Sequence, residues 1–416
     1  MNETQISADD TRRNLKNVVV LSICQALFNS GRTLTFIAAS LVSISMLGDN
    51  MTFVTAPVTM MLVGTSAGTL PSAYLMRVLG RKGGFVIGSL VGAFGSGVAA
   101  YAISIDSFLL FNIGIFLFGM YGGTAQQYRF AAADVAPEHI KAKSVSIVIA
   151  MGVVGGLVGP ETVLMTKNAL GTLPFEGTFW ALGLFCLLAA VIILAVDIPK
   201  LTKEEFADTG RPLIEIMKHH TFIVALIAAL FGYAVMNLLM TATPVTMRVE
   251  AFTDNNIARV IQWHVVGMFA PGFFTGSLIK RFGVVRIIVT GSALLLLSVI
   301  IALSGTSFLH FFGALFCLGV GWNFTFTGGT LLVTEVHSPS ERAKVQGMND
   351  FILFTGLACS SLFAGVIYHF MGWMWVNLAT APMILAVLLS ALWLRSIRRK
   401  EPAIQHSKEE AEAAVE

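Results

Sequence analysis

Two pairs of side chains with soft or borderline donor atoms stand out in otherwise apolar segments of the sequence. Met236 and Met240 are four residues apart in one apolar run, and His264 and Met268 are four apart in the next. On an α-helix, residues at this spacing share one face. Thioether sulfur is a soft, uncharged ligand that suits Cu(I), and imidazole also tolerates Cu(II). The four side chains form a candidate copper site, provided that the two segments are neighbouring helices.

The depth of these residues favours a shared site. Counting seven residues inward from the outer ends of the two apolar runs reaches Met240 and His264, and counting eleven reaches Met236 and Met268. At 1.5 Å per residue, these layers lie roughly 10 and 16 Å deep. The second layer is then close to the middle of an apolar membrane core of roughly 30 Å. We therefore expect the four ligands to face each other in two layers.

The acidic residues near this candidate site are too few for a harder metal. Neither run contains Asp or Glu, and Glu250 and Asp254 lie in the short connection between them. Magnesium, manganese and calcium sites are built from carboxylate and carbonyl oxygens. The donor set therefore favours copper over these metals.

The composition identifies the elements that must hold these residues. Hydrophobic residues make up 55% of the 416 residues and charged residues only 12%, and the mean hydropathy is +0.77. Soluble domains carry roughly a quarter charged residues. So few charges cannot cover a water-soluble surface, which excludes an ordinary soluble enzyme, and we expect no enzymatic activity. The net charge of +3 is small and gives no indication of a nucleic-acid partner.

Twelve apolar runs of membrane-spanning length follow one another along the chain. They predict helices at residues 17–42, 53–75, 84–105, 108–133, 144–165, 177–196, 222–247, 257–279, 285–303, 308–334, 345–369 and 373–394. The longest polar interval follows the sixth run. It divides the chain into a cytoplasmic tail (1–16), a six-helix bundle (17–196), a cytoplasmic linker (197–220), a second bundle (221–395) and a cytoplasmic tail (396–416). We predict an all-α integral membrane protein with twelve transmembrane helices in two pseudo-symmetric six-helix bundles.

The basic residues give the orientation of these helices. With the N-terminus inside, every Lys and Arg except Arg32, Lys167, Arg248 and Arg259 falls in a segment on the inner side. This asymmetry follows the positive-inside rule. We therefore predict a multi-pass protein that is surrounded by membrane lipid and has both termini in the cytoplasm.

The two halves of the chain also repeat each other. Segment 80–89 has the same Gly to Gly-Ser spacing as segment 283–292, and segment 134–143 matches segment 335–344. An offset of about 200 residues indicates that a six-helix unit was duplicated. On these features the chain resembles the major facilitator superfamily over essentially its full length. The resemblance implies the major facilitator fold and alternating access around a cavity between the halves.

The connection between the second and third predicted helices resembles the signature loop of this family. The family normally has an acid before the pattern Arg, x, Gly, Arg, Lys or Arg, whereas residues 77–82 here read Arg-Val-Leu-Gly-Arg-Lys, without the acid. The second half likewise has bases at 280–281 where an acid is expected. The basic side chains remain candidates for a cytoplasmic gate, namely Arg77, Arg81, Lys82 and Arg281.

Two further pairs of charged residues lie within the predicted helices. Arg32 and Glu161 are unlike charges in the outer half of the first bundle. They could form a structural ion pair, or Glu161 could couple transport to protons. Arg129 and Asp350 come from different halves, and facing each other they would form an inner gate.

The two metal-binding motifs carry a second, narrower resemblance. MxxxM on the seventh helix and HxxxM on the eighth resemble the CcoA-type copper importers of bacteria, which supply copper for assembling cbb-type cytochrome c oxidase. The resemblance implies that Met236, Met240, His264 and Met268 bind copper as transported cargo, with no permanent cofactor. It also implies import across the bacterial inner membrane. We expect a monomer, and the sequence does not identify the copper chaperone or oxidase assembly factor downstream.

A glycine-rich stretch in the fifth predicted helix supports a different function. Residues 152–160 contain four glycines and end in Gly-Pro, which resembles the motif of drug and proton antiporters in the same superfamily. Small residues of this kind let helices approach closely. The alternative is therefore proton-coupled export of drugs or other small hydrophobic compounds. A plain packing role for the Met and His residues, and a non-transporting scaffold for oxidase assembly, also remain open.

Overall fold

The computed structural model describes residues 8–47, 53, 56–170, 174–198 and 210–413. Within these ranges the chain is helical, with short connections and no β-strand. The first half contains α1 (Ala8–Leu47), α2 (Ala56–Ser104), α3 (Phe108–Ala125), α4 (Tyr128–Val135), α5 (Glu138–Ala150), α6 (Gly152–Thr166) and α7 (Glu176–Ile192). The second half contains α9 (Leu213–Met217), α10 (His220–Val249), α11 (Asp254–Phe269), α12 (Gly272–Phe282), α13 (Val284–Ser304), α14 (Phe308–Thr334) and α15 (Arg342–Ala413).

Two of these helices, α2 and α15, each contain more than one membrane crossing. The 49 residues of α2 would extend roughly 70 Å, more than twice the apolar core, and its backbone breaks at Gly80 with φ of 80°. In α15 the backbone breaks in the same way at Gly372, where φ is 77°. Glycine adopts such angles at little cost. Each break therefore separates one crossing from the next.

Other crossings are made of two shorter helices in sequence. Ten helices in the described residues are long and apolar enough to span a membrane, with α3 joined to α4 and α5 to α6. Of these ten, α2 contains two crossings because of its break at Gly80. The helices α11 and α12, which are not among the ten, together form one further crossing that is interrupted near Pro271. The described residues thus make twelve crossings. This confirms the predicted all-α membrane fold.

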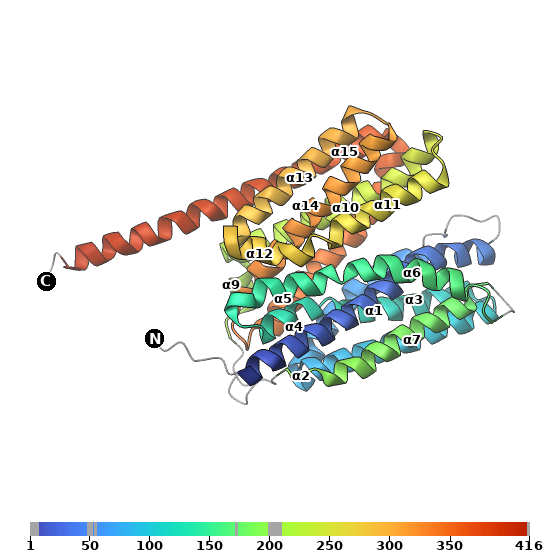
Figure 1. Cartoon of the computed structure of the whole chain (residues 1–416), viewed down its shortest axis with the longest axis horizontal. Coiled ribbons are helices and arrows are strands. Elements are labelled where there is room, and N and C mark those ends of the chain that lie inside the picture. The colour runs from blue at the N-terminus through green and yellow to red at the C-terminus, as the bar shows by residue number, and fades with distance from the viewer. Residues whose placement is uncertain (1–7, 48–52, 54–55, 171–173, 199–209, 414–416) are drawn as a thin grey trace.

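The crossings form two bundles, one from each half of the chain (Figure 1). One hydrophobic cluster contains only residues between Val18 and Val196. The other belongs mainly to the second half but includes residues of the first, among them Phe130 and Ile149. Each bundle therefore has its own core, and the second core continues across the interface.

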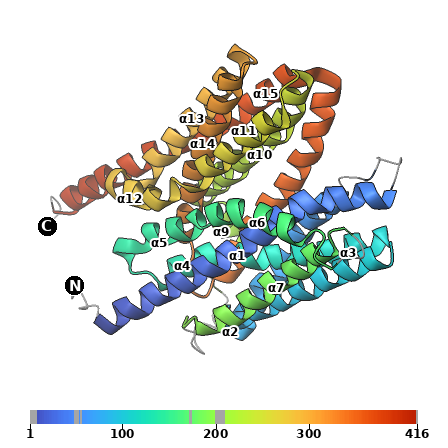
Figure 2. The ribbon, with the colours of Figure 1, turned by 45° about the vertical axis from the view of Figure 1, so that its right-hand side comes forward.

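The two bundles touch along only part of their length. The beginning of α1 and the end of α15 lie at the same end of the molecule, which we call the terminal side (Figure 1). Figures 1 and 2 show the bundles in contact near α5 and α12, toward this side, and separated at the opposite end. Gly276 of α12 permits the contact, because a Cβ there would lie 2.5 Å from the backbone of Ala142 and Lys143. The molecule is therefore closed on the terminal side.

Candidate functional site

A small cavity lies between the two bundles and is lined by both. The first bundle contributes Gln25, Asn29, Arg32, Gln126, Arg129 and Ile149, and the second contributes Tyr233, Phe269, Trp322 and Phe326. Its volume is about 20 Å³, while a single water needs roughly 10–15 Å³. One wall is therefore mainly polar and the other mainly aromatic, and in this conformation they enclose space for little more than water.

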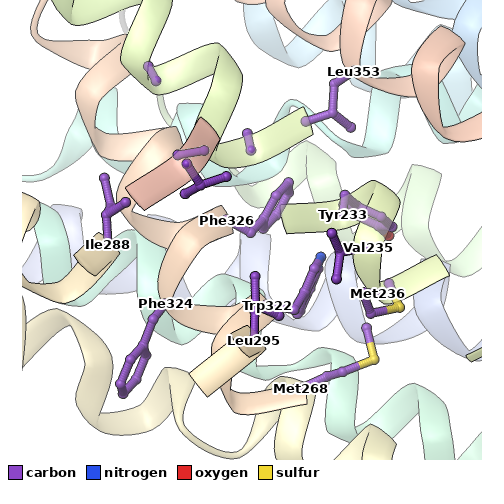
Figure 3. Close-up of a cluster of buried hydrophobic side chains, with 14 of the residues drawn as sticks. Tyr233, Val235, Met236, Met268, Ile288, Leu295, Trp322, Phe324, Phe326 and Leu353 are labelled. Atoms are coloured by element: carbon purple, nitrogen blue, oxygen red, sulfur yellow. The ribbon is translucent and has the colours of Figure 1, made fainter. Parts of the chain in front are cut away.

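The aromatic wall is built on α10, α11 and α14. Trp322 and Phe326 are four residues apart on α14, and their rings stack with centroids 5.0 Å apart and planes 12° apart. Tyr233 meets both rings edge-on, at 5.2 Å and 5.4 Å, and Phe269 packs against Trp322 at 5.6 Å. Figure 3 shows Tyr233 beside Trp322 and Phe326. These contacts hold the rings in place before any cargo arrives.

The polar wall comes chiefly from one face of α1. Gln25, Asn29 and Arg32 follow one another at spacings of four and three residues, which places them on one helix face. The Nδ2 of Asn29 and the Nε1 of Trp322 are buried and have no hydrogen-bond partner. A buried donor without a partner costs about 1–3 kcal/mol. The two donors therefore favour a ligand or water with acceptor atoms in the cavity.

The predicted pair of Arg129 and Asp350 is formed across the two bundles. Arg129 Nη2 lies 2.5 Å from Asp350 Oδ1, and Gln127 Nε2 donates to Asp350 Oδ2 at 2.9 Å. Both charged side chains are buried. The Arg129 guanidinium also lies over the rings of Phe130 and Phe326, at 4.6 Å and 4.7 Å. Since Arg129 also lines the cavity, this ion pair connects the cavity to the closed side.

The expected ion pair between Arg32 and Glu161 is not formed. Arg32 Nη1 instead donates to the hydroxyl of Tyr233 at 3.1 Å, and Glu161 is exposed on α6. Arg32 lies on the face of α1 that lines the cavity, so its side chain reaches across to the second bundle. Within the described part of the chain, no carboxylate lies within 4.0 Å of Arg32. The cavity wall therefore carries one net positive charge after Asp350 has neutralised Arg129.

Arg81 organises a second polar network on the terminal side. Its Nη2 contacts Asp134 Oδ2 at 2.6 Å and the Oε1 of Gln346, from the other bundle, also at 2.6 Å. Arg342, likewise from the other bundle, contacts Asp134 at 3.5 Å. The sequence motif identified Arg81 but not these partners. The internal repeat could have indicated Asp134, because this residue is the first of segment 134–143, which matches segment 335–344 of the second half.

The other three candidate gate residues have separate positions. Arg77 lines a small pocket on the terminal side together with Arg81 and Arg342. Lys82 and Arg281 are exposed, and the Arg281 guanidinium lies 5.2 Å from the ring of Phe282. Among the predicted gate residues, Arg129, Asp350 and Arg81 make hydrogen bonds that cross between the bundles in this conformation.

An ion pair outside the membrane fastens the chain between the bundles. Arg211 Nε and Nη2 donate to the two carboxylate oxygens of Glu341 at 2.9 Å and 2.8 Å. These hydrogen bonds lower the pKa of Glu341 well below its ordinary value. Nearby, burial lowers the pKa of His337. The connection that precedes α10 is thereby attached to the turn between α14 and α15.

Three of the four predicted copper ligands are buried in the second bundle. In the view of Figure 3 the side chains of Met236 and Met268 point toward one another, and both belong to the hydrophobic cluster that contains Trp322. His264 is buried, its Nδ1 pairs with the carbonyl of Leu315 at 2.7 Å, and its Nε2 has no partner. Met240 is only partly buried against the same core. Within the described residues, no group of three His, Cys, Asp or Glu side chains could hold a metal, so a metal would depend on the thioethers.

The glycine-rich stretch of α6 packs against other helices. Gly155 lies against Asn29 of α1, whereas Gly152 and Gly156 lie against Phe269 and Val265 of the second bundle. A Cβ at any of these positions would overlap its neighbour. The stretch therefore has a packing role, which brings the polar wall and the second bundle together.

Comparison with known proteins gives the family and its relatives. The model of the Major Facilitator Superfamily matches residues 21–261 and 260–416. The riboflavin transporter RfnT of Brucella anthropi is 42% identical over 376 residues, which are 90% of this chain and 94% of that protein. The uncharacterized MFS-type transporter YdeG of Bacillus subtilis is 28% identical over 414 residues, with 94% of this chain and 95% of that protein covered.

Solved structures share the fold at low sequence identity. FucP in its outward conformation has a TM-score of 0.72 and 15% identity, covering 90% of this chain and 98% of that one. The proton:xylose symporter XylE, bound to 6-bromo-6-deoxy-D-glucose, has a TM-score of 0.76 and 12% identity, covering 93% and 96%. At this identity the likeness shows the fold alone.

Proposed function

Because the chain belongs to the Major Facilitator Superfamily and is a secondary transporter, we propose that its cargo is riboflavin, bound between the aromatic and polar walls. The observation that carries this proposal is the pair of unpartnered donors, on Asn29 and Trp322, beside a preformed stack of rings. The 42% identity to a riboflavin transporter over nine-tenths of the chain supports it.

The two walls match the two chemical parts of riboflavin. Its tricyclic ring is flat and aromatic, and stacking of such a ring on an aromatic side chain contributes about 1–3 kcal/mol. Its ring carbonyls and ribityl hydroxyls are acceptors for the free donors of Asn29 and Trp322. The amides of Gln25 and Gln126 extend this polar surface. A drug-like apolar cargo would leave these buried polar groups unpaired, which disfavours the drug exporter.

The cavity must enlarge before such a cargo can bind. Pockets for organic ligands typically have volumes of about 300–1,000 Å³, far above the 20 Å³ enclosed here. The bundles already separate at the end opposite the termini (Figure 2). A further movement at that end would open the cavity while the terminal side stays closed, as alternating access requires.

The charge of the cavity distinguishes riboflavin from a metal cation. Arg32 leaves one positive charge that no nearby carboxylate neutralises. A guanidinium donates hydrogen bonds readily to carbonyl oxygens, whereas it repels a monovalent cation strongly in a low-dielectric cavity. The electrostatics therefore favour a neutral, acceptor-rich cargo.

Riboflavin binding to the purified transporter tests this proposal directly. Riboflavin fluorescence should fall in a saturable manner on titration, because stacking on Trp322 and Phe326 quenches the ring. Vesicles that contain the protein should also take up labelled riboflavin. Asn29→Leu should weaken both signals, whereas Trp263→Leu, at an exposed position on α11, should change neither. An unquenched titration together with vesicles that take up no riboflavin would contradict the proposal.

Copper import remains a second candidate because of one observation on His264. Its Nδ1 pairs with a backbone carbonyl, which leaves the buried Nε2 free to bind a metal. Met236, Met240 and Met268 would complete the ligand set, and the copper would serve assembly of cbb-type oxidase. Vesicle uptake of radioactive copper by His264→Leu and Met236→Leu tests this function. Wild-type uptake in both variants would eliminate these residues as ligands.

The proposed orientation is the same for either cargo. The distribution of Lys and Arg supports a protein of the bacterial inner membrane with both termini in the cytoplasm. The terminal side would then face the cytoplasm, and the cavity would fill from outside. Impermeant thiol labelling of single cysteines in the loops on the two sides tests this orientation.

A further inference from the structure

Asp350 is a carboxylate that is fully buried where the two bundles meet. Among the described residues, the buried carboxylates are Asp350 and Glu341, and Glu341 precedes α15 at the edge of the membrane. Asp350 lies in the third turn of α15, which begins at Arg342, and its side chain is fully buried. A carboxylate in such a place is costly, and it commonly marks a proton path in membrane transporters.

The charged groups that face Asp350 come from the first bundle. Arg129 of α4 binds one of its oxygens at 2.5 Å. Arg81 of α2 is linked to it through Gln127, because Arg81 Nη1 donates to Gln127 Oε1 at 3.2 Å and Gln127 Nε2 donates to Asp350 Oδ2. Gln127 and Asn349 donate the remaining hydrogen bonds. When the bundles separate on the terminal side, Asp350 must leave both arginines. A charged Asp350 would then lose its partners, whereas a protonated one would not.

Arg129 is prepared for the loss of its carboxylate partner. Its guanidinium lies over the rings of Phe130 and Phe326. Among the described residues, Asp350 is the carboxylate at salt-bridge distance from it. Cation–π contacts stabilise a guanidinium most when it is removed from water. Arg129 can therefore stay charged and in place when Asp350 becomes neutral. It also lines the cavity, so protons that enter the cavity reach the ion pair.

From this geometry we propose that Asp350 binds the proton that is transported together with the cargo. A proton from the side opposite the termini adds to the Asp350 carboxylate and breaks its ion pair with Arg129. The bundles then separate on the terminal side, and the neutral acid meets water there and releases the proton. The ionised carboxylate returns to Arg129 and closes that side again. Cargo that occupies the cavity during this cycle crosses in the same direction as the proton.

Proton-driven accumulation of cargo tests this assignment, and it rests on the proposed riboflavin transport. In proteoliposomes with an acidic exterior, the wild type should accumulate riboflavin several-fold above equilibrium. Asp350→Asn should still exchange riboflavin across the membrane but should not accumulate it. Glu161→Gln removes the exposed acid of α6 and should accumulate riboflavin like the wild type. Accumulation by Asp350→Asn, or its loss in Glu161→Gln alone, would overturn the assignment.

A second measurement does not depend on the cargo. Spin labels at the exposed positions His139 and Arg286, in a chain without its native cysteines, report the separation of the bundles on the terminal side. In the wild type, lower pH should increase the separated population, and in Asp350→Asn that population should be high at every pH. The same pH response in both proteins would overturn the proposal. If the wild type takes up no riboflavin, the cargo proposal fails, and this measurement still decides the role of Asp350.

Discussion

The first bundle lines the central cavity with amides and guanidinium groups, whereas the second lines it with aromatic rings. Each bundle consists of six crossings. The cavity-lining residues Gln25, Asn29 and Arg32 of the first bundle carry amide and guanidinium groups, whereas the wall of the second bundle is formed by aromatic residues such as Tyr233 and Trp322. A duplicated unit thus retained its fold while its cavity-facing residues diverged. For the cargo that we propose, the two similar halves would supply opposite chemistry to one site.

The largest expected effect comes from breaking the ion pair that joins the two bundles. Arg129→Leu leaves Asp350 buried without its partner, and loss of one member of a buried pair costs about 3–5 kcal/mol. We expect a clear fall in the thermal unfolding temperature of the purified protein. The double variant Arg129→Leu/Asp350→Leu should recover much of it, because no charge is then left unpaired. Equal losses in the single and double variants would contradict this account of the interface.

Removal of the central ring of the aromatic wall should have the next largest effect. Trp322→Leu should weaken riboflavin binding by about 1–3 kcal/mol, because stacking is lost. Trp322→Phe keeps a ring but lacks the Nε1 donor, so its affinity should lie between those of Trp322→Leu and the wild type. Fluorescence titration measures all three. If Trp322→Phe binds riboflavin as weakly as Trp322→Leu, the hydrogen bond from Trp322 Nε1 contributes more than ring stacking does. The aromatic wall would then act through a polar group, and its difference from the polar wall would be smaller than proposed.

The contact between α5 and α12 tests whether close packing keeps the terminal side closed. Gly276→Ala places a Cβ against the backbone of Ala142 and Lys143, and overpacking of this kind costs about 1–3 kcal/mol. We expect the spin labels at His139 and Arg286 to move apart. Gly313→Ala is the matched control, because a Cβ there would keep ordinary contact distances of 3.7 Å and more. Unchanged separation in Gly276→Ala would show that packing is not what limits opening.

The smallest expected effect concerns the ion pair outside the membrane. Arg211 holds the pKa of Glu341 below its ordinary value, so the pair stabilises the folded state above the unfolded pKa of about 4.3. That contribution is lost as the pH falls through the lower, folded pKa. Glu341→Gln should therefore lower the unfolding temperature at pH 7 and make it less sensitive to acid. Identical pH profiles for the variant and the wild type would mean that this pair adds no stability.

Part of the site could be predicted from residue type alone. Arg129 and Asp350 attracted attention because a charge in a membrane helix needs a partner, and the structure pairs them. The same reasoning was wrong for Arg32 and Glu161, because unlike charges at similar depth do not have to face each other. The spacing of Gln25, Asn29 and Arg32 on one face of α1 was the missed signal. This spacing predicts a polar face of α1 that is turned away from lipid, and it places Arg32 on that face, which lines the cavity.

The aromatic wall could not be separated from ordinary packing in the sequence. Tyr233, Trp322 and Phe326 stand in apolar runs where aromatic residues also serve as core. The Met and His motifs were visible because their donor atoms are rare in such runs. Their relation to the cavity was not, since the position of Met268 next to Phe269 and Trp322 depends on how α11 packs against α14.

The sequence by itself determined the twelve crossings, because lipid offers the backbone no hydrogen bonds and an apolar run of this length must be helical. It also determined the division into two related halves, since the repeat and the polar interval are local features. Only the tertiary structure decided which side chains share the cavity and that the terminal side is closed. Those properties depend on contacts between residues far apart in the sequence, such as Arg129 and Asp350, which are separated by 221 residues. Local patterns do not fix how the helices that carry such residues are turned toward each other.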